Sequence, residues 1–178
     1  GVCEFAPEIL ADKIEYLNFP LAADSLISKN IRTPNLRKGE PLSAMKLSAE
    51  RERLSNIFRN NGYYYFTPEC ISYKADTVMR PLHVQLHVQP SKSIPKAATQ
   101  RYHMGRTRIT LLEHDQYNTT DTLSFRDVTM AYNGKDGVPP LMMGAKRRFL
   151  CYKHGDLFNQ ELQQLGKEKL YELGILVL

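Results

Sequence analysis

The chain has 178 residues, enough for one ordinary domain or two small ones, and its 42% hydrophobic and 24% charged residues are typical of a folded protein. No stretch approaches the roughly 20 consecutive apolar residues of a membrane-spanning helix. The formal net charge is +5, but the lysines and arginines are scattered among acids, which argues against a nucleic-acid-binding stripe.

The two ends of the sequence indicate a piece of a longer protein. The first ten residues lack the basic and apolar regions of a signal peptide, and Leu178 lies in an apolar run where a strand is expected to continue. The three cysteines, Cys3, Cys70 and Cys151, form no CxxC pair and fit neither a disulfide framework nor a zinc site. Because no nucleophile turn surrounds Cys70 or Cys151, small buried side chains are favoured over a catalytic thiol at these two positions.

A strand and a short helix are predicted first. Residues 13–19 are predicted as the strand, and Pro20 suits the first turn of a helix over residues 20–31. Residues 33–35 then break this helix. The predicted buried face of the helix consists of Ala23, Leu26, Ile27 and Ile31.

A longer amphipathic helix follows a tight loop over residues 37–42. Its N-cap is either Ser43 or Ser48, and it ends at Gly62, because glycine adopts the left-handed conformation without a steric penalty. Apolar and charged residues alternate at helical spacing. Leu47, Leu54, Ile57 and Phe58 are predicted to be buried, and Glu50, Arg51, Arg53 and Asn56 are predicted to face water.

An aromatic run of Tyr63, Tyr64, Tyr65 and Phe66 comes directly after the helix. Aromatic rings near a cation such as Arg59 are one means of stacking nucleic-acid bases. The position of the run favours another role, in which it begins a strand and alternate rings fill the interface between helix and sheet.

A β-hairpin is predicted from residues 70–75 and 82–89, with leucine and valine alternating with histidine and glutamine in the second strand. His83 and His87 lie on its wet face. On a helix their spacing would suit one metal ion, but on a strand their Cα atoms lie roughly 13 Å apart. We therefore expect solvent-facing histidines and no metal site.

A linker over residues 91–101 separates a second module over residues 102–178. Gly155 precedes its helix as Gly39 precedes the longer helix of the first half, which predicts a repeat. The predicted elements are strands over 106–112 and 128–132, a polar connection at 118–121, and a helix carrying Leu162, Leu165, Leu170 and Leu173 before Gly174.

The remaining charged side chains of the second module are expected to face solvent. Asp121, Asp127 and Asp136 lack the alternation of an EF-hand calcium loop and are expected to be loop acids. The basic cluster at residues 146–148 is smaller than the clusters of about four to eight cations that bind lipid headgroups.

Residues 11–90 combine the order strand, helix, loop, helix and hairpin with the segment ERERLSNIFRNNGYYYF. In both respects they resemble the POTRA domain, a β-α-α-β-β module, of BamA/TamA-like outer-membrane protein assembly factors of the surface-antigen family. Residues 102–178 resemble the next POTRA domain, with an inserted segment and without the closing hairpin. The resemblance implies an α+β fold of tandem modules, each a small three-stranded mixed sheet with two helices on one face, the second module being incomplete. Residues 1–10 are then the end of a preceding segment.

The function that this resemblance implies is a non-enzymatic scaffold, without a cofactor or metal, at the periplasmic face of the outer membrane of a Gram-negative bacterium. The implied partners are unfolded outer-membrane client proteins or accessory assembly subunits, with an outer-membrane barrel continuous with the chain beyond this piece. Two alternatives stay open, a POTRA-type docking module of a cell-division or secretion protein and a small nucleic-acid-binding module.

A sheet edge is the expected binding site of such a scaffold, because unpaired main-chain groups accept an added strand of almost any sequence. In the family, the second strand of the module lies at an edge. Carried onto this chain, the candidate binding residues are Cys70, Ile71, Ser72, Tyr73 and Lys74. The charge of Lys74 also suits an edge that must avoid uncontrolled pairing.

Overall fold

The computed structural model of the chain describes residues 7–30, 34–110, 120–125, 128–133 and 150–172. Two compact units are present, one of Gly1–Arg59 with Tyr63–Gln100 and the other of Asn60–Gly62 with Arg101–Leu178. In the described ranges, no helix has the length and apolar character needed to cross a membrane.

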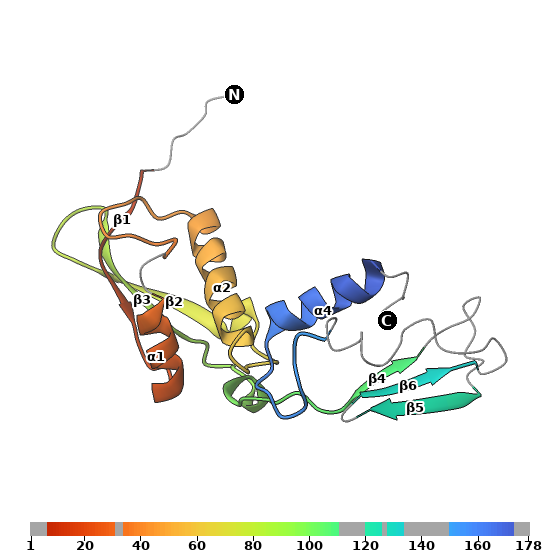
Figure 1. Cartoon of the computed structure of the whole chain (residues 1–178). Helices are drawn as coiled ribbons and strands as arrows, with labels where there is room; N and C mark the ends of the chain where they lie inside the picture. Colours follow the sequence, from red (N-terminus) through yellow and green to blue (C-terminus); the bar gives the residue numbers. More distant parts are fainter. Residues whose placement is uncertain (1–6, 31–33, 111–119, 126–127, 134–149, 173–178) are drawn as a thin grey trace. The chain divides into compact units, whose positions relative to one another are not determined.

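The first unit has the β-α-α-β-β order that the resemblance implies (Figure 1). Its two short 3₁₀ turns, η1 and η2, flank the hairpin. The elements are β1 (Leu10–Tyr16), α1 (Leu21–Lys29), α2 (Ala44–Arg59), η1 (Pro68–Cys70), β2 (Ile71–Thr77), β3 (His83–Pro90) and η2 (Lys96–Thr99).

The three strands form a mixed sheet in the order β1-β3-β2, with β1 parallel and β2 antiparallel to β3. Side chains from both helices pack against Leu86 and Val88 of the central strand. The predicted fold class is therefore confirmed in this unit, and β2 is left at an edge of the sheet.

Strand β1 begins and ends earlier than the predicted strand over residues 13–19. It pairs with β3 from Leu10 opposite His83 to Tyr16 opposite Val88. Asn18, with a φ of 62°, then turns the chain towards α1. Pairing with a distant strand, rather than the local apolar pattern, sets these bounds.

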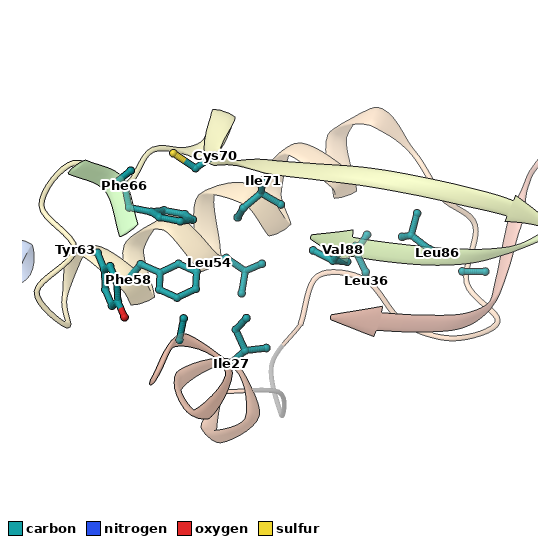
Figure 2. Close-up of a cluster of buried hydrophobic side chains, with 13 residues drawn as sticks. Ile27, Leu36, Leu54, Phe58, Tyr63, Phe66, Cys70, Ile71, Leu86 and Val88 are labelled. Carbon is teal, nitrogen blue, oxygen red and sulfur yellow. The ribbon is translucent and has the colours of Figure 1, made fainter. Parts of the chain in front are cut away.

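The core of the first unit lies between the sheet and the two helices (Figure 2). The ring of Phe58 lies at its aromatic end, with centroid distances of 4.4 Å to Phe66, 5.4 Å to Tyr63 and 5.9 Å to Phe19. Burial of each large apolar side chain contributes about 2 kcal/mol. The other buried members include Ala11, Ala23, Ile27, Leu36, Leu54, Cys70, Ile71, Leu86 and Val88.

The aromatic run forms a turn, so the prediction that it begins a strand is wrong. The Phe66 N–H donates to the Tyr63 carbonyl at 3.2 Å, which brings these two rings to the same side of the chain. Tyr63 and Phe66 are buried, whereas Tyr64 and Tyr65 are exposed. Two rings fill the core as predicted, but turn geometry replaces the alternation of a strand.

Both ends of α2 follow the predicted capping chemistry. The Ser43 hydroxyl accepts a hydrogen bond from the Lys46 N–H at 3.1 Å, which identifies Ser43 rather than Ser48 as the N-cap. After Arg59 the chain passes through Gly62, whose φ of 98° is one that glycine adopts without strain.

Glu50 is completely buried, so the prediction that it faces water is wrong. Its carboxylate accepts hydrogen bonds from the Tyr16 hydroxyl at 2.8 Å, the Asn35 N–H at 2.8 Å, and Arg53 at 2.6 and 2.9 Å. Arg53 also donates to the Asn30 carbonyl at 2.9 Å and is largely buried, again against the prediction. This ion pair joins α2 to β1 and to the segment after α1.

The second unit has a second mixed sheet in the order β4-β6-β5, with β4 parallel and β5 antiparallel to β6. Ile109, Met130 and Leu170 are buried together, whereas Leu162 and Leu165 of the same helix as Leu170 are exposed. The elements are β4 (Thr107–Thr110), β5 (Asp121–Phe125), β6 (Val128–Tyr132) and α4 (Gln160–Glu172).

Strands β4 and β6 were predicted, but β5 occupies sequence assigned to the polar connection and its flank. Asp121 is exposed there, within a strand rather than a loop. The described side chains of β5 all face water, so its sequence shows no alternation of apolar and polar residues. This explains why the sequence did not predict the strand. Ile31, Asp127, Asp136, residues 146–148 and Leu173 lie outside the described residues.

The glycine loop before α2 pairs with the outer side of β1. The Gly39 N–H donates to the Ala11 carbonyl at 2.9 Å, and the Leu42 N–H donates to the Ile9 carbonyl at 2.8 Å. Gly39 has a φ of 79°, which a side chain would strain. This loop therefore covers the first part of the β1 edge.

The loop before α4 repeats the same bonds. The Gly155 N–H donates to the Met104 carbonyl at 2.8 Å, and the Phe158 N–H donates to the Tyr102 carbonyl at 2.8 Å, with the same sequence spacing as in the first unit. Asn159 caps α4 by accepting from the Leu162 N–H at 3.1 Å, as Ser43 caps α2. The loop and helix start of the predicted repeat are therefore present in both units.

Candidate binding edge on strand β2

The main-chain groups of β2 alternate between β3 and the free edge of the sheet. The Ser91 N–H donates to the Cys70 carbonyl at 2.7 Å, and the pairing continues from Cys70 along β2 with no shift in register. Hydrogen-bonded pairs alternate along an antiparallel ladder, so every second residue of β2 bonds to β3. Ser72, Lys74 and Asp76 face β3 in this way, and Ile71, Tyr73, Ala75 and Thr77 present their main-chain groups to the edge.

This edge is the more open of the two edges of the sheet. The Ile71 N–H is already used, because it donates to the Pro68 carbonyl. In the described part of the chain, no hydrogen bond reaches the edge-facing main-chain groups of Tyr73 and Ala75. On the opposite side of the sheet, by contrast, the Gly39 loop bonds to β1.

Four of the five predicted binding residues, Ile71, Ser72, Tyr73 and Lys74, lie on this edge strand. Cys70 precedes it in η1 and is buried, with its sulfur 3.7 Å from the Thr67 hydroxyl. Binding at these residues stays a prediction. The sequence pattern did not single out Ala75 and Thr77 as edge residues, because only the register shows which main-chain groups are unpaired.

The sheet face opposite the helices is polar, but its histidines are not simply solvent-facing. The His83 Nδ1 lies 2.6 Å from Asp12 Oδ1, and the side chain of His83 is 17% exposed. His87 is 16% exposed and lies between two carboxylates, 3.4 Å from Glu15 and 3.6 Å from Asp76. Each histidine contacts different acids, and no group of three metal-ligating residues forms among the described residues.

On the helix side of β2, Tyr73 connects the edge strand to α2. Its hydroxyl donates to the Leu47 carbonyl at 2.7 Å. Burial raises the pKa of the Tyr73 hydroxyl, and the negative charge of Glu50 raises it further. The guanidinium carbon of Arg51 lies 5.0 Å from the Tyr73 ring centroid, so Arg51 covers this ring instead of extending into water as predicted.

An apolar pocket of about 170 Å³ opens at the end of the first core beside Phe19, Phe58, Tyr63 and Phe66. Its lining contains no carboxylate, histidine, cysteine, lysine or arginine. The pocket therefore offers shape and mainly apolar contact.

The two cysteines in the described residues are both free. Cys70 is buried, as predicted, and Cys151 is partly exposed with the Lys169 amine 3.8 Å from its sulfur. They belong to different units, and neither joins a histidine and an acid in a catalytic arrangement that the structure describes.

Comparison with known proteins finds similarity to solved structures alone. No protein-family model matches the chain. No curated protein sequence matches it either.

Three solved structures illustrate the similarity. The POTRA3-5 fragment of BamA from Haemophilus influenzae has 12% sequence identity and a TM-score of 0.46, with 94% of this chain and 50% of that chain covered. POTRA1-2 of the periplasmic domain of Omp85 from Anabaena has 14% identity, a TM-score of 0.37, and coverage of 94% and 79%. The N-terminal domain of Omp85 from the cyanobacterium Thermosynechococcus elongatus has 13% identity, a TM-score of 0.25, and coverage of 96% and 88%. The chain thus spans half the length of the Haemophilus structure.

Proposed function

We propose that this chain is a non-enzymatic, periplasmic POTRA-type scaffold of an outer-membrane protein assembly or translocation factor, and that it binds extended segments of unfolded client proteins along β2. The observation that supports this proposal is the open edge of the first sheet, where Tyr73 and Ala75 have unpaired main-chain groups. Unfolded outer-membrane proteins are rich in segments that form strands, and accessory assembly subunits are the second class of partner.

The chemistry of the edge suits a client of variable sequence. Main-chain hydrogen bonds provide affinity without selecting side chains, and an added strand extends the ladder of β2 outward. The exposed Lys74, which lies 3.4 Å from Asp76, limits pairing with a second copy of the edge.

Substitution of Ala75 by proline tests this function. Proline removes the edge-facing N–H of Ala75 but leaves the N–H groups that bond to β3, and the side chain at this position is exposed. A photo-crosslinker at Thr77 would report capture of an unfolded outer-membrane barrel protein diluted from urea. We expect Ala75→Pro to lower the crosslinking yield by about fivefold or more, the effect of losing at least one main-chain hydrogen bond.

Ala75→Val is the matched control, because it changes the side chain and keeps the N–H. It should capture the client as well as the unsubstituted chain does. Thermal unfolding of each variant shows whether the sheet is intact, and Thr77→Pro, with the crosslinker moved to Lys74, provides a second edge variant if Ala75→Pro unfolds. Full crosslinking by a folded proline variant would contradict the proposal.

A further inference from the structure

The guanidinium of Arg51 lies beside strand β2 and has an N–H group that lacks a hydrogen-bond acceptor. Its Nε atom is buried and has no hydrogen-bond partner. Among the described residues, Arg51 forms no ion pair, and its guanidinium contacts the ring of Tyr73. A buried N–H that lacks an acceptor is unfavourable by about 1–3 kcal/mol, so a shift of the Arg51 side chain towards an acceptor on a bound segment would be favourable.

The position of Arg51 on α2 directs it towards this edge. Successive residues of a helix are about 100° apart, so Arg51 and Arg53 lie on opposite flanks of α2. Arg53 bonds to Glu50 and to the Asn30 carbonyl, on the side of β1 and α1. Arg51 lies on the other flank, above Tyr73 of the edge strand.

A strand added to β2 would bring one of its side chains to Arg51. Residues directly opposite in an antiparallel pair have their side chains on the same face, with Cβ atoms about 5 Å apart. Tyr73 points towards α2, because its hydroxyl donates to the Leu47 carbonyl. The residue of the added segment opposite Tyr73 therefore also points towards α2, next to the guanidinium.

We infer that the β2 edge selects extended segments that carry an acidic side chain opposite Tyr73, which Arg51 binds through charge-assisted hydrogen bonds. Arginine is suited to this role, because its planar fork pairs with both oxygens of a carboxylate. This inference rests on the proposed function, since it requires that a segment pairs with β2.

Glu69 is an acid whose charge interacts with that of Arg51. A hydrogen bond from Thr67 holds the pKa of the Glu69 carboxyl below its usual value, and the positive charge of Arg51 contributes to the lowering. The Glu69 side chain forms no ion pair with Arg51 in the described structure. Removing the Glu69 charge should therefore strengthen the attraction of Arg51 for an incoming carboxylate.

Two synthetic probe peptides test the inference with the full chain. Both have roughly nine residues alternating between threonine and valine, which favours an extended strand, and both have blocked ends. One carries a central glutamate and the other a central glutamine. Dissociation constants from fluorescence anisotropy should show about tenfold tighter binding of the glutamate peptide, the effect of about one charge-assisted hydrogen bond.

The variants separate Arg51 from general electrostatics. Arg51→Gln should abolish the preference for glutamate, and Glu69→Gln should increase it. Lys38→Gln removes an exposed cation elsewhere on the unit and should leave the preference unchanged. Loss of the preference in Lys38→Gln to the same extent as in Arg51→Gln would overturn the inference.

The outcomes also separate this inference from the proposed function. Equal binding of both peptides that is lost in Ala75→Pro would overturn the role of Arg51 and leave edge binding supported. Failure of both peptides to bind, or binding that Ala75→Pro does not weaken, would overturn both.

Discussion

Two glutamates of α2, Glu50 and Glu52, have opposite environments. Glu50 is completely buried, yet its neighbour Glu52 is exposed. The helical pattern of charged residues predicts that Glu50 faces solvent, but the hydrogen-bond donors that surround its carboxylate come from Tyr16, Asn35 and Arg53. Two of these three lie on segments distant in sequence, and periodicity along one helix carries no information about them.

Glu50→Gln is predicted to destabilise the first unit substantially. The substitution keeps the size of the side chain but leaves the largely buried Arg53 without its counter-charge. Removing one partner of such a pair typically lowers the free energy of unfolding by about 3 kcal/mol. Urea denaturation followed by circular dichroism measures this change, and Glu52→Gln is the matched control with an expected change near zero. A Glu50→Gln variant as stable as the control would show that the ion pair contributes little.

The same carboxylate predicts a loss of stability in acid. Burial by itself raises the pKa of Glu50, but hydrogen bonds from Arg53, the Asn35 N–H and Tyr16 outweigh burial and lower it overall. A group whose pKa is lower in the folded state stabilises the fold above its unfolded pKa of about 4.3, and this contribution is lost as pH falls through the folded value. The urea midpoint of the unsubstituted chain should therefore fall more steeply below about pH 4 than that of Glu50→Gln. Parallel curves for the two proteins would contradict this assignment.

At the scale of elements, the features that the sequence predicted well were local patterns of alternation and capping. The alternation of Leu86 and Val88 with His87 predicted β3, and the capping residues Ser43 and Gly62 bound α2 correctly. The early start of β1 is set by its register with the distant strand β3, which local patterns do not encode, whereas β5 was missed because its described side chains are exposed and show no apolar alternation. Likewise, only the structure shows which main-chain groups of β2 are unpaired.

Alanine substitution of Gly39 and of Gly155 should lower stability by similar amounts. Gly39 and Gly155 have φ values of 79° and 89°, and an added Cβ would meet no atom within 4 Å at either position. Alanine should therefore destabilise each loop only through backbone strain, by about 1–2 kcal/mol. Gly105, which also has open space but whose φ lies outside the left-handed region, is the control, and Gly105→Ala should be neutral or slightly stabilising. Thermal unfolding checks all three, and equal effects at the three glycines would contradict the assigned role of the left-handed loops.

At the scale of the whole molecule, the two units repeat a loop and a helix start but differ in the order of the elements after the first strand. In the first unit the hairpin β2–β3 comes after α2, whereas in the second the hairpin β5–β6 comes before α4. The buried position of Glu50 corresponds to Gly166 in the second unit when both are counted from the helix N-cap, so the Glu50 ion pair belongs to the first unit. The repeat therefore shares backbone geometry without sharing core chemistry.

Amide hydrogen exchange of β2, measured by NMR on the full chain with and without an unfolded outer-membrane barrel protein, tests the central claim most directly. In the free chain, the amides of Ser72, Lys74 and Asp76 should exchange slowly, because they bond to β3, while those of Tyr73 and Ala75 should exchange faster. Binding of the client should slow exchange at Tyr73 and Ala75 by about tenfold or more, as their N–H groups become part of a new ladder. A bound client that leaves exchange at Tyr73 and Ala75 unchanged would contradict the account.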